Sequence, residues 1–297
     1  MSQQETTFSG FVTLLGRTNV GKSTLLNALL NQKVSIVTEK PQTTQFLVKG
    51  ILTEGNRQAV FVDTPGLHRP HSKYGEMFLG DIPKALEEVD LVVVLVEPGD
   101  RVEGGTAHLL EMLQKVEAPR FLVVNKIDLS TKGEALQTAK MIGEACSFDF
   151  VLPVSALKYE NVDFLREKIL EALPEGPFYY PEDYVTDLPQ PLYVAEVIRE
   201  KVMLLTRDEV PHAVGVLVDT IQEREDGAYY IEATLYVERE SQKGILIGKG
   251  GSMIKKIGTL AREELEDVTG RKIILKTRVK VMKNWQNTDK AKLFRPQ

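Results

Sequence analysis

Residues 11–172 alternate short apolar runs with stretches of helical periodicity. Several of the runs are continuous Val, Leu and Phe, which is typical of strands buried on both faces of a mostly parallel sheet. The pattern predicts a doubly wound α/β domain. Its expected strands cover residues 12–15, 49–52, 59–62, 91–96, 121–124 and 151–154, and its expected helices begin near Lys22, Tyr74, Gly105, Lys132 and Val162.

A proline-rich stretch at residues 174–191 interrupts this pattern, with five prolines in eighteen residues. Such a stretch continues neither a helix nor a central strand, so we place a linker there. Beyond it the pattern predicts an α+β unit of order α-β-β-α-α-β, provided that a short helix precedes Gly248. We therefore expect an α/β domain at 1–173, the linker at 174–191 and a second domain at 192–297.

Composition and charge narrow the class of protein. The chain has 297 residues, of which 42% are hydrophobic and 27% charged, as in soluble globular proteins. A polar N-terminus, the lack of a long apolar run and the single Cys146 lead us to expect a cytoplasmic protein. We also expect a monomer. The net charge is −5, yet residues 241–297 hold 14 Lys and Arg against 5 Asp and Glu. This asymmetry indicates an anionic partner, although a solvated lysine face would give the same count.

The segment from Gly16 to Ser23 reads G-x-x-x-x-G-K-S, between a predicted strand and a predicted helix. In that setting the pattern is a phosphate-binding P-loop rather than a glycine-rich turn. Its backbone N–H groups and the helix N-terminus would surround a polyphosphate. Lys22 would reach the β- and γ-phosphates, and the Ser23 hydroxyl would hold Mg²⁺.

Three more motifs follow in order, each after a predicted strand: Asp63-Thr64-Pro65-Gly66, Asn125-Lys126-Ile127-Asp128 and Ser155-Ala156-Leu157. Asp63 can hold Mg²⁺ through water, and the Gly66 N–H can reach a γ-phosphate. Asp128 can accept hydrogen bonds from N1–H and N2–H₂ of guanine, a donor pair that adenine lacks. Four motifs in this order resemble the translation-factor-related P-loop GTPases.

The resemblance assigns roles to three further positions. Pro41-Gln42-Thr43-Thr44 corresponds to switch I, where we favour Thr44 over Thr43 as the Mg²⁺ ligand. Leu67 stands where Ras-like GTPases have a water-orienting Gln, which implies slow hydrolysis. Asn19 corresponds to an asparagine that ligates K⁺ in related GTPases, so K⁺ activation is a hypothesis; a plain loop residue is the alternative, because turns favour asparagine.

Near the basic end, Gly248-Lys249-Gly250-Gly251 matches the G-x-x-G loop of KH domains. In such domains small residues let a single-stranded RNA backbone approach while the bases lie along an apolar groove. The loop, its flanking lysines and the α-β-β-α-α-β order favour a KH domain over another α/β accessory domain. We expect RNA contacts from Lys243, Ile247, Gly248, Lys249, Gly250, Gly251, Lys255 and Lys256, with more phosphate contacts from Lys272, Lys276, Arg278 and Lys280.

A P-loop GTPase domain followed by one type II KH domain resembles the Era family, the bacterial ribosome-assembly GTPases. The resemblance implies a Mg²⁺-dependent GTPase that binds single-stranded RNA near the 3′ end of small-subunit ribosomal RNA, on the small-subunit precursor. An RNA-binding protein gated by GTP with negligible hydrolysis, or a GTPase at the inner-membrane surface, are the alternatives. Departures from the family are Thr18 for Pro, Gln45 for Arg and the unaligned segment 290–297.

The predicted site residues form three sets. Lys22, Thr44, Gly66 and Asn19 serve the reaction, and Ser23, Thr44 and Asp63 hold the metal. GTP and GDP contacts come from Gly16, Arg17, Thr18, Asn19, Val20, Gly21, Lys22, Ser23, Thr24, Asp63, Thr64, Pro65, Gly66, Asn125, Lys126, Asp128, Ser155, Ala156 and Leu157.

Overall fold

The computed structural model describes residues 6–40, 43–66, 86 and 89–295. Its contacts divide the chain into two compact units, and the chain passes from the first to the second between Asp187 and Leu188. Among the described residues, no helix is both long and apolar enough to cross a bilayer.

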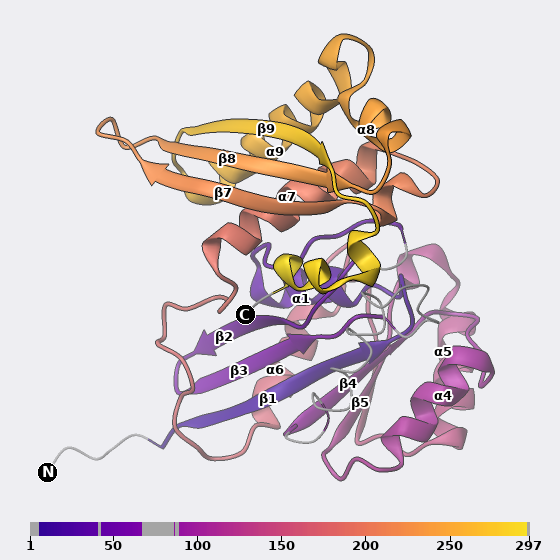
Figure 1. Ribbon diagram of the computed structural model, residues 1–297. Helices are drawn as coiled ribbons and strands as arrows, with labels where there is room; N and C mark the ends of the chain where they lie inside the picture. Colours follow the sequence, from indigo (N-terminus) through magenta and orange to yellow (C-terminus); the bar gives the residue numbers. More distant parts are fainter. Residues whose placement is uncertain (1–5, 41–42, 67–85, 87–88, 296–297) are drawn as a thin grey trace, which may run out of the picture. The chain divides into compact units, whose positions relative to one another are not determined.

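The first unit is built on a six-stranded sheet of order β2-β3-β1-β4-β5-β6 (Figure 1). Strand β2 is antiparallel to β3, and the other neighbours are parallel. The strands are β1 (Phe8–Gly16), β2 (Val48–Glu54), β3 (Arg57–Asp63), β4 (Leu91–Val96), β5 (Arg120–Val124) and β6 (Phe150–Pro153).

Helices cover both faces of this sheet (Figure 1). Leucines on α1 (Lys22–Leu30) and α6 (Val162–Glu171) pack against one face, and those on α4 (Gly104–Leu113) pack on the other together with α5 (Lys132–Ala145). The all-buried strand β4 shows why the sequence carries continuous apolar runs. The predicted doubly wound fold is thereby confirmed, while the helix expected near Tyr74 lies outside the described residues.

The proline-rich segment packs on the sheet of the first unit as far as Asp187. The buried side chain of Gln58 accepts hydrogen bonds from the N–H groups of Tyr179 (2.8 Å) and Tyr180 (3.0 Å) and donates to the Tyr180 carbonyl (2.8 Å). Residues 185–186 bond to the outer edge of β2, with Ile51 N–H donating to the Val185 carbonyl at 2.8 Å. Most of this segment is thus an ordered part of the first unit.

The second unit has the predicted order α-β-β-α-α-β, including the short helix before Gly248. It comprises α7 (Gln190–Leu205), β7 (Gly215–Glu223), β8 (Tyr229–Val237), α8 (Glu240–Ile247), α9 (Ser252–Thr269) and β9 (Ile273–Val281). Helix α7 begins inside the predicted linker because Pro191 occupies its first turn, where a missing N–H costs nothing. In the sheet, of order β7-β8-β9, β8 is parallel to β9.

Residues 282–295 follow β9, and Phe294, in the segment left unaligned above, packs beside β7 and β8. Trp285 is fully buried and donates from its indole to the Ala213 carbonyl at 3.2 Å. The ring of Phe294 lies 4.4 Å from that of Trp285, centroid to centroid. A Cβ on Gly215 would lie 2.6 Å from the Phe294 ring, so this glycine makes room for the segment.

Candidate nucleotide and RNA sites

Four parallel strands end at the same edge of the six-stranded sheet, and each predicted nucleotide motif follows one of them. Strand β1 ends at Gly16, β3 at Asp63, β5 at Val124 and β6 at Pro153. Ligands of α/β sheets bind at this carboxyl edge. The fold therefore brings together motifs that are far apart in the sequence.

The P-loop backbone needs residues that tolerate a left-handed conformation. Gly21 has a φ of 99° and forms the N-cap of α1, and a Cβ there would lie 2.3 Å from the side-chain nitrogen of Asn125. Asn19 has a φ of 63°, which asparagine adopts more easily than most residues. The loop leads directly into the first turn of α1, with Thr24 half-buried in that turn. A helix N-terminus is a favourable place for a phosphate.

Lys22 supplies the charge of this loop. Its Nζ donates to the carbonyls of Gly16 (3.2 Å) and Arg17 (3.0 Å), and the residue is 6% exposed. Burial lowers the pKa of Lys22 to about 8, partly opposed by the nearby Asp63 carboxylate. A polyphosphate would stabilise the charged ammonium, so this lysine is prepared for an anionic ligand.

The oxygen atoms around Asp63 fit Mg²⁺. The Ser23 and Thr44 hydroxyl oxygens lie 2.9 Å apart, and Asp63 Oδ2 accepts from Ser23 at 2.7 Å. Neighbouring ligands of octahedral Mg²⁺ at about 2.0–2.1 Å also lie about 2.9 Å apart. Asp63 is fully buried, yet its Oδ1 has no hydrogen-bond partner. A buried carboxylate oxygen of this kind is well suited to the hydration shell of a cation.

The two candidate threonines of switch I lie in different surroundings. Thr44 Oγ1 lies beside Ser23 and 3.5 Å from Asp63 Oδ2. Thr43 Oγ1 instead lies 2.7 Å from Thr38 Oγ1 and donates to the Lys40 carbonyl at 2.8 Å. The structure thus brings Thr44, and not Thr43, to the candidate metal ligands. Pro41 and Gln42 lie outside the described residues.

The D-T-P-G turn packs against the P-loop. The buried Thr64 hydroxyl donates to the Leu14 carbonyl at 2.8 Å, which ties the turn to β1. A Cβ on Gly66 would lie 2.7 Å from the Thr18 Cα, so only glycine permits this approach. Pro65, between Thr64 and Gly66, is buried. Leu67, on which the expectation of slow hydrolysis depends, lies outside the described residues.

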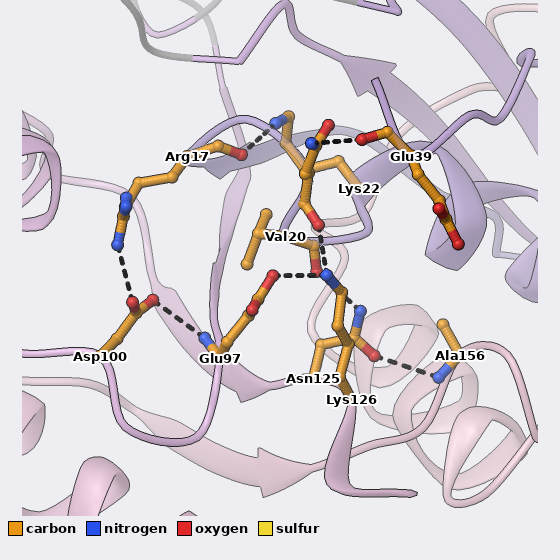
Figure 2. A network of polar contacts seen from close by, with 10 residues as sticks. Arg17, Val20, Lys22, Glu39, Glu97, Asp100, Asn125, Lys126 and Ala156 are labelled. Atoms are coloured by element: carbon orange, nitrogen blue, oxygen red, sulfur yellow. Dashed lines mark hydrogen bonds and ion pairs between the residues drawn. The ribbon is translucent and has the colours of Figure 1, made fainter. Parts of the chain in front are cut away.

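The N-K-x-D motif is bonded to the P-loop (Figure 2). Asn125 donates to the Val20 carbonyl at 2.9 Å and accepts from the Ala156 N–H at 3.1 Å, so it joins three motifs. Lys126 donates to the Asn19 carbonyl at 2.5 Å. Through these bonds Asn125 and Lys126 hold the N-K-x-D loop against the P-loop.

Asp128 is exposed, as a base-contacting carboxylate must be before a nucleotide arrives. Its Oδ1 accepts from the Ser155 hydroxyl at 2.5 Å, and Ser155 Oγ in turn accepts from the Lys158 N–H at 3.1 Å. Ser155 therefore orients the carboxylate, a role that its motif did not reveal. Leu157 is 72% exposed beside it and offers an apolar surface to a planar base.

Two acidic residues that the sequence analysis missed complete this network (Figure 2). Glu97 Oε1 lies 2.5 Å from Lys126 Nζ. Asp100 accepts from the Arg17 guanidinium at 2.8 Å and from the Glu97 N–H at 3.0 Å. Both follow β4 at the same sheet edge as the four motifs, and that position was the available signal. They connect the P-loop to the lysine of the base-binding motif.

The G-x-x-G segment of the second unit forms a tight turn between α8 and α9. Gly248, Gly250 and Gly251 have φ values of 73°, 60° and 80°. A Cβ on Gly248 would lie 2.8 Å from the Met253 Cβ, whereas one on Gly250 or Gly251 would meet no atom within 4 Å. The space beside the last two glycines is open to an approaching nucleic-acid backbone.

The lysines and isoleucines around this turn differ in their exposure to solvent. Lys249, Lys255 and Lys256 are exposed, whereas Lys243 is half-buried and lies 3.8 Å from Glu240. Half-buried Ile247 and 47% exposed Ile245 provide apolar surface. Ile257 is fully buried in the core, and Ile254 packs against that core. The exposed lysines and the two isoleucines of α8 remain the candidate RNA contacts.

Two of the cations predicted to contact phosphates, Lys276 and Arg278, lie on β9. Ile273 and Val279 of this strand face the helical core, so the alternating Lys276 and Arg278 lie on the other face of the sheet. Arg278 lies 3.2 Å from Asp219 and Lys276 lies over the ring of Tyr230. The phosphate contacts predicted for Lys276 and Arg278 therefore stay a prediction, on the sheet face that strand alternation turns away from the helices.

Comparison with known proteins places both units in described families. Residues 11–126 match the model of the 50S ribosome-binding GTPases. Residues 209–286 match the KH domain.

Relatives cover almost the whole chain. GTPase Era of Thermoanaerobacter sp. (strain X514) is 49% identical over 280 residues, 94% of this chain and 93% of its own. GTPase Era of Ruminiclostridium cellulolyticum is 43% identical over 281 residues, 95% and 94% of the two chains.

Two solved structures have the same fold over nearly their full length. One is an Aquifex aeolicus Era variant bound to GDP and AlF₄⁻, with a TM-score of 0.90 and 36% identity over 97% of this chain and 98% of that one. The other is Era in complex with MgGDPNP and nucleotides 1506–1542 of 16S ribosomal RNA, with a TM-score of 0.89 and the same identity and coverage. With both domains, the order of the motifs and the full length in agreement, the chain belongs to the Era family of GTPases.

Proposed function

We propose that this GTPase is a slow, GTP-dependent switch that binds single-stranded RNA near the 3′ end of small-subunit ribosomal RNA and acts in assembly of the small subunit. The observation that carries the proposal is the presence of two sites in one chain. One is the phosphate and guanine site at the sheet edge, and the other is the open Gly250–Gly251 turn with exposed lysines. The complex of Era with a 16S ribosomal RNA fragment supports the choice of RNA.

The residues of the nucleotide site have different roles in GTP binding and hydrolysis. Lys22 binds the phosphates, and Asp128 orients the guanine while Asn125 and Lys126 hold its loop to the P-loop. Ser23, Thr44 and Asp63 would hold Mg²⁺, which neutralises phosphate charge when bound. The Gly66 N–H would donate to a γ-phosphate. Leu67 cannot hydrogen-bond to water, so turnover without a partner is slow.

Single-turnover GTP hydrolysis with and without a 3′ fragment of small-subunit RNA tests the proposal. Acceleration by this RNA, and no acceleration by an unrelated single strand, is the expected result. RNA binding that depends on the nucleotide but leaves hydrolysis unchanged would favour the alternative of a gated RNA-binding protein.

We also propose that K⁺ activates hydrolysis through Asn19. The side-chain amide of Asn19 links the P-loop to the segment just before switch I, because its Nδ2 donates to the Glu39 carbonyl at 2.7 Å. Oxygen atoms of both segments would be available to a cation there. Turnover should fall when Na⁺ replaces K⁺ at equal ionic strength, and Asn19→Ala should lose this dependence. Equal turnover in the two salts would refute the role of K⁺.

We further propose that the protein works as a cytoplasmic monomer and that its basic C-terminal part binds RNA in preference to the inner-membrane surface. The turn that accommodates a single strand supports RNA over lipid. Flotation with anionic liposomes, competed by RNA, tests the preference. Sedimentation of the protein at several concentrations tests the monomer.

A further inference from the structure

The fully buried carboxylate of Asp63 is hydrogen-bonded unevenly. Three hydroxyls face its Oδ2: Ser23 at 2.7 Å, Ser35 at 3.0 Å and Thr44 at 3.5 Å. No hydrogen-bond partner faces Oδ1. A buried carboxylate is costly unless polar groups stabilise it. The hydroxyls therefore fix one oxygen of Asp63 and leave the other available to a cation or its water.

Ser35 differs from the other two hydroxyls. Ser23 and Thr44 lie 2.9 Å from each other, so both are placed to bind the metal. Ser35 reaches Asp63 from the irregular segment after α1 and is only 2% exposed, between buried Val34 and Ile36. Mg²⁺ would bind the hydroxyl oxygens of Ser23 and Thr44. The Ser35 hydroxyl would then donate to Asp63 without binding the metal.

Asn27 on α1 determines the position of Ser35. Its Oδ1 accepts from the Val34 N–H at 2.9 Å and from the Ser35 N–H at 3.0 Å. Its Nδ2 donates to the Ser35 carbonyl at 2.7 Å. One side chain thus holds both backbone groups of Ser35. Helix α1 also carries Lys22 and Ser23. The same helix therefore positions Ser35, through Asn27, and the residues predicted to bind phosphate and Mg²⁺.

We propose that Ser35, held by Asn27, is a positioning residue for Mg²⁺ that holds the Asp63 carboxylate in place beside the candidate metal ligands Ser23 and Thr44. The inference rests on the proposed function only in requiring a guanine nucleotide and Mg²⁺ at the P-loop. It adds a residue outside the four nucleotide motifs to the determinants of metal affinity.

Release of a fluorescent GDP derivative from the full chain, followed over a range of free Mg²⁺ set with EDTA, tests the role of Ser35. In Ser35→Ala, the Mg²⁺ concentration that half-maximally slows release should rise about tenfold, as expected for the loss of one hydrogen bond to a charged group. Release in EDTA alone should change less than about twofold, because Ser35 acts through the metal. Ser35→Cys, which keeps the volume but donates weakly, should shift in the same direction.

Ser9→Ala is the matched control. Ser9 is also 2% exposed, and its hydroxyl donates to the Pro177 carbonyl at 2.6 Å, at the other end of β1. The Mg²⁺ dependence of GDP release from Ser9→Ala should equal that of the wild type. A Ser35→Ala variant with wild-type Mg²⁺ dependence, or with a shift no larger than that of Ser9→Ala, would overturn the inference. If GDP release from the wild-type protein did not depend on Mg²⁺, the proposed nucleotide site would be overturned, and the inference with it.

Discussion

Replacement of Asp128 by Asn should change the base that the protein prefers. Guanine presents two donors, N1–H and N2–H₂, to the two carboxylate oxygens. Xanthine has a carbonyl in place of the 2-amino group. An amide offers one acceptor and one donor, which suits xanthine and opposes the 2-amino group of guanine.

The structure sets the expected magnitude. Asp128 Oδ1 is already fixed by the Ser155 hydroxyl at 2.5 Å, so the carboxylate meets the base without reorientation. Loss of one hydrogen bond to a charged acceptor costs about 1.5–3 kcal/mol. Since about 1.4 kcal/mol corresponds to tenfold in affinity, GDP binding should weaken by about 10- to 150-fold before the donor–donor repulsion is counted.

Competition of GDP and xanthosine diphosphate against a fluorescent nucleotide measures the preference. Asp128→Asn should lose affinity for GDP and gain affinity for xanthosine diphosphate. Asp163→Asn serves as the control, because Asp163 is an exposed aspartate on α6 that pairs with Arg166. Unchanged GDP preference in Asp128→Asn would remove this residue from the base contact and refute the reasoning.

Four further predictions concern RNA binding, nucleotide binding and stability. Placing Asp at Lys249 and Gly250 should abolish RNA binding in a gel-shift assay but leave GDP affinity intact, because a Cβ on Gly250 meets no atom within 4 Å; loss of both activities would indicate misfolding. Phe294→Ala should lower the urea stability of the second unit by about 3–5 kcal/mol, since it removes a ring packed on buried Trp285; an unchanged midpoint would contradict this packing role. GDP affinity should stay level below pH 8 and weaken above it, because Lys22, whose pKa is about 8 without ligand, must then gain a proton on binding. Between that pKa and the ordinary value of 10.5 the unfolded chain binds more protons, so stability of the nucleotide-free protein should rise with pH in urea titrations.

Much of the fold and of the site could be predicted because both depend on local patterns. The predicted strands overlapped all six strands of the first unit, several of them as continuous apolar runs, and the motifs stood at strand ends. The sequence was less informative where a position depends on distant packing. The partners of Lys276 and Arg278, which are the Tyr230 ring and Asp219, could not be predicted from it. Pro191, which we placed in the linker because proline does not continue a helix, lies in the first turn of α7.

By itself the sequence determined the chemistry of this protein: a phosphate loop, a carboxylate matched to guanine, and a glycine turn suited to a single strand of RNA. These features lie in contiguous residues, whose backbone and functional groups need little context. Tertiary structure decided which of several similar hydroxyls meet at Asp63. It selected Thr44 over Thr43 and added Ser35, because hydrogen bonds between α1, β3 and the loops after them depend on distances that only the folded sheet sets.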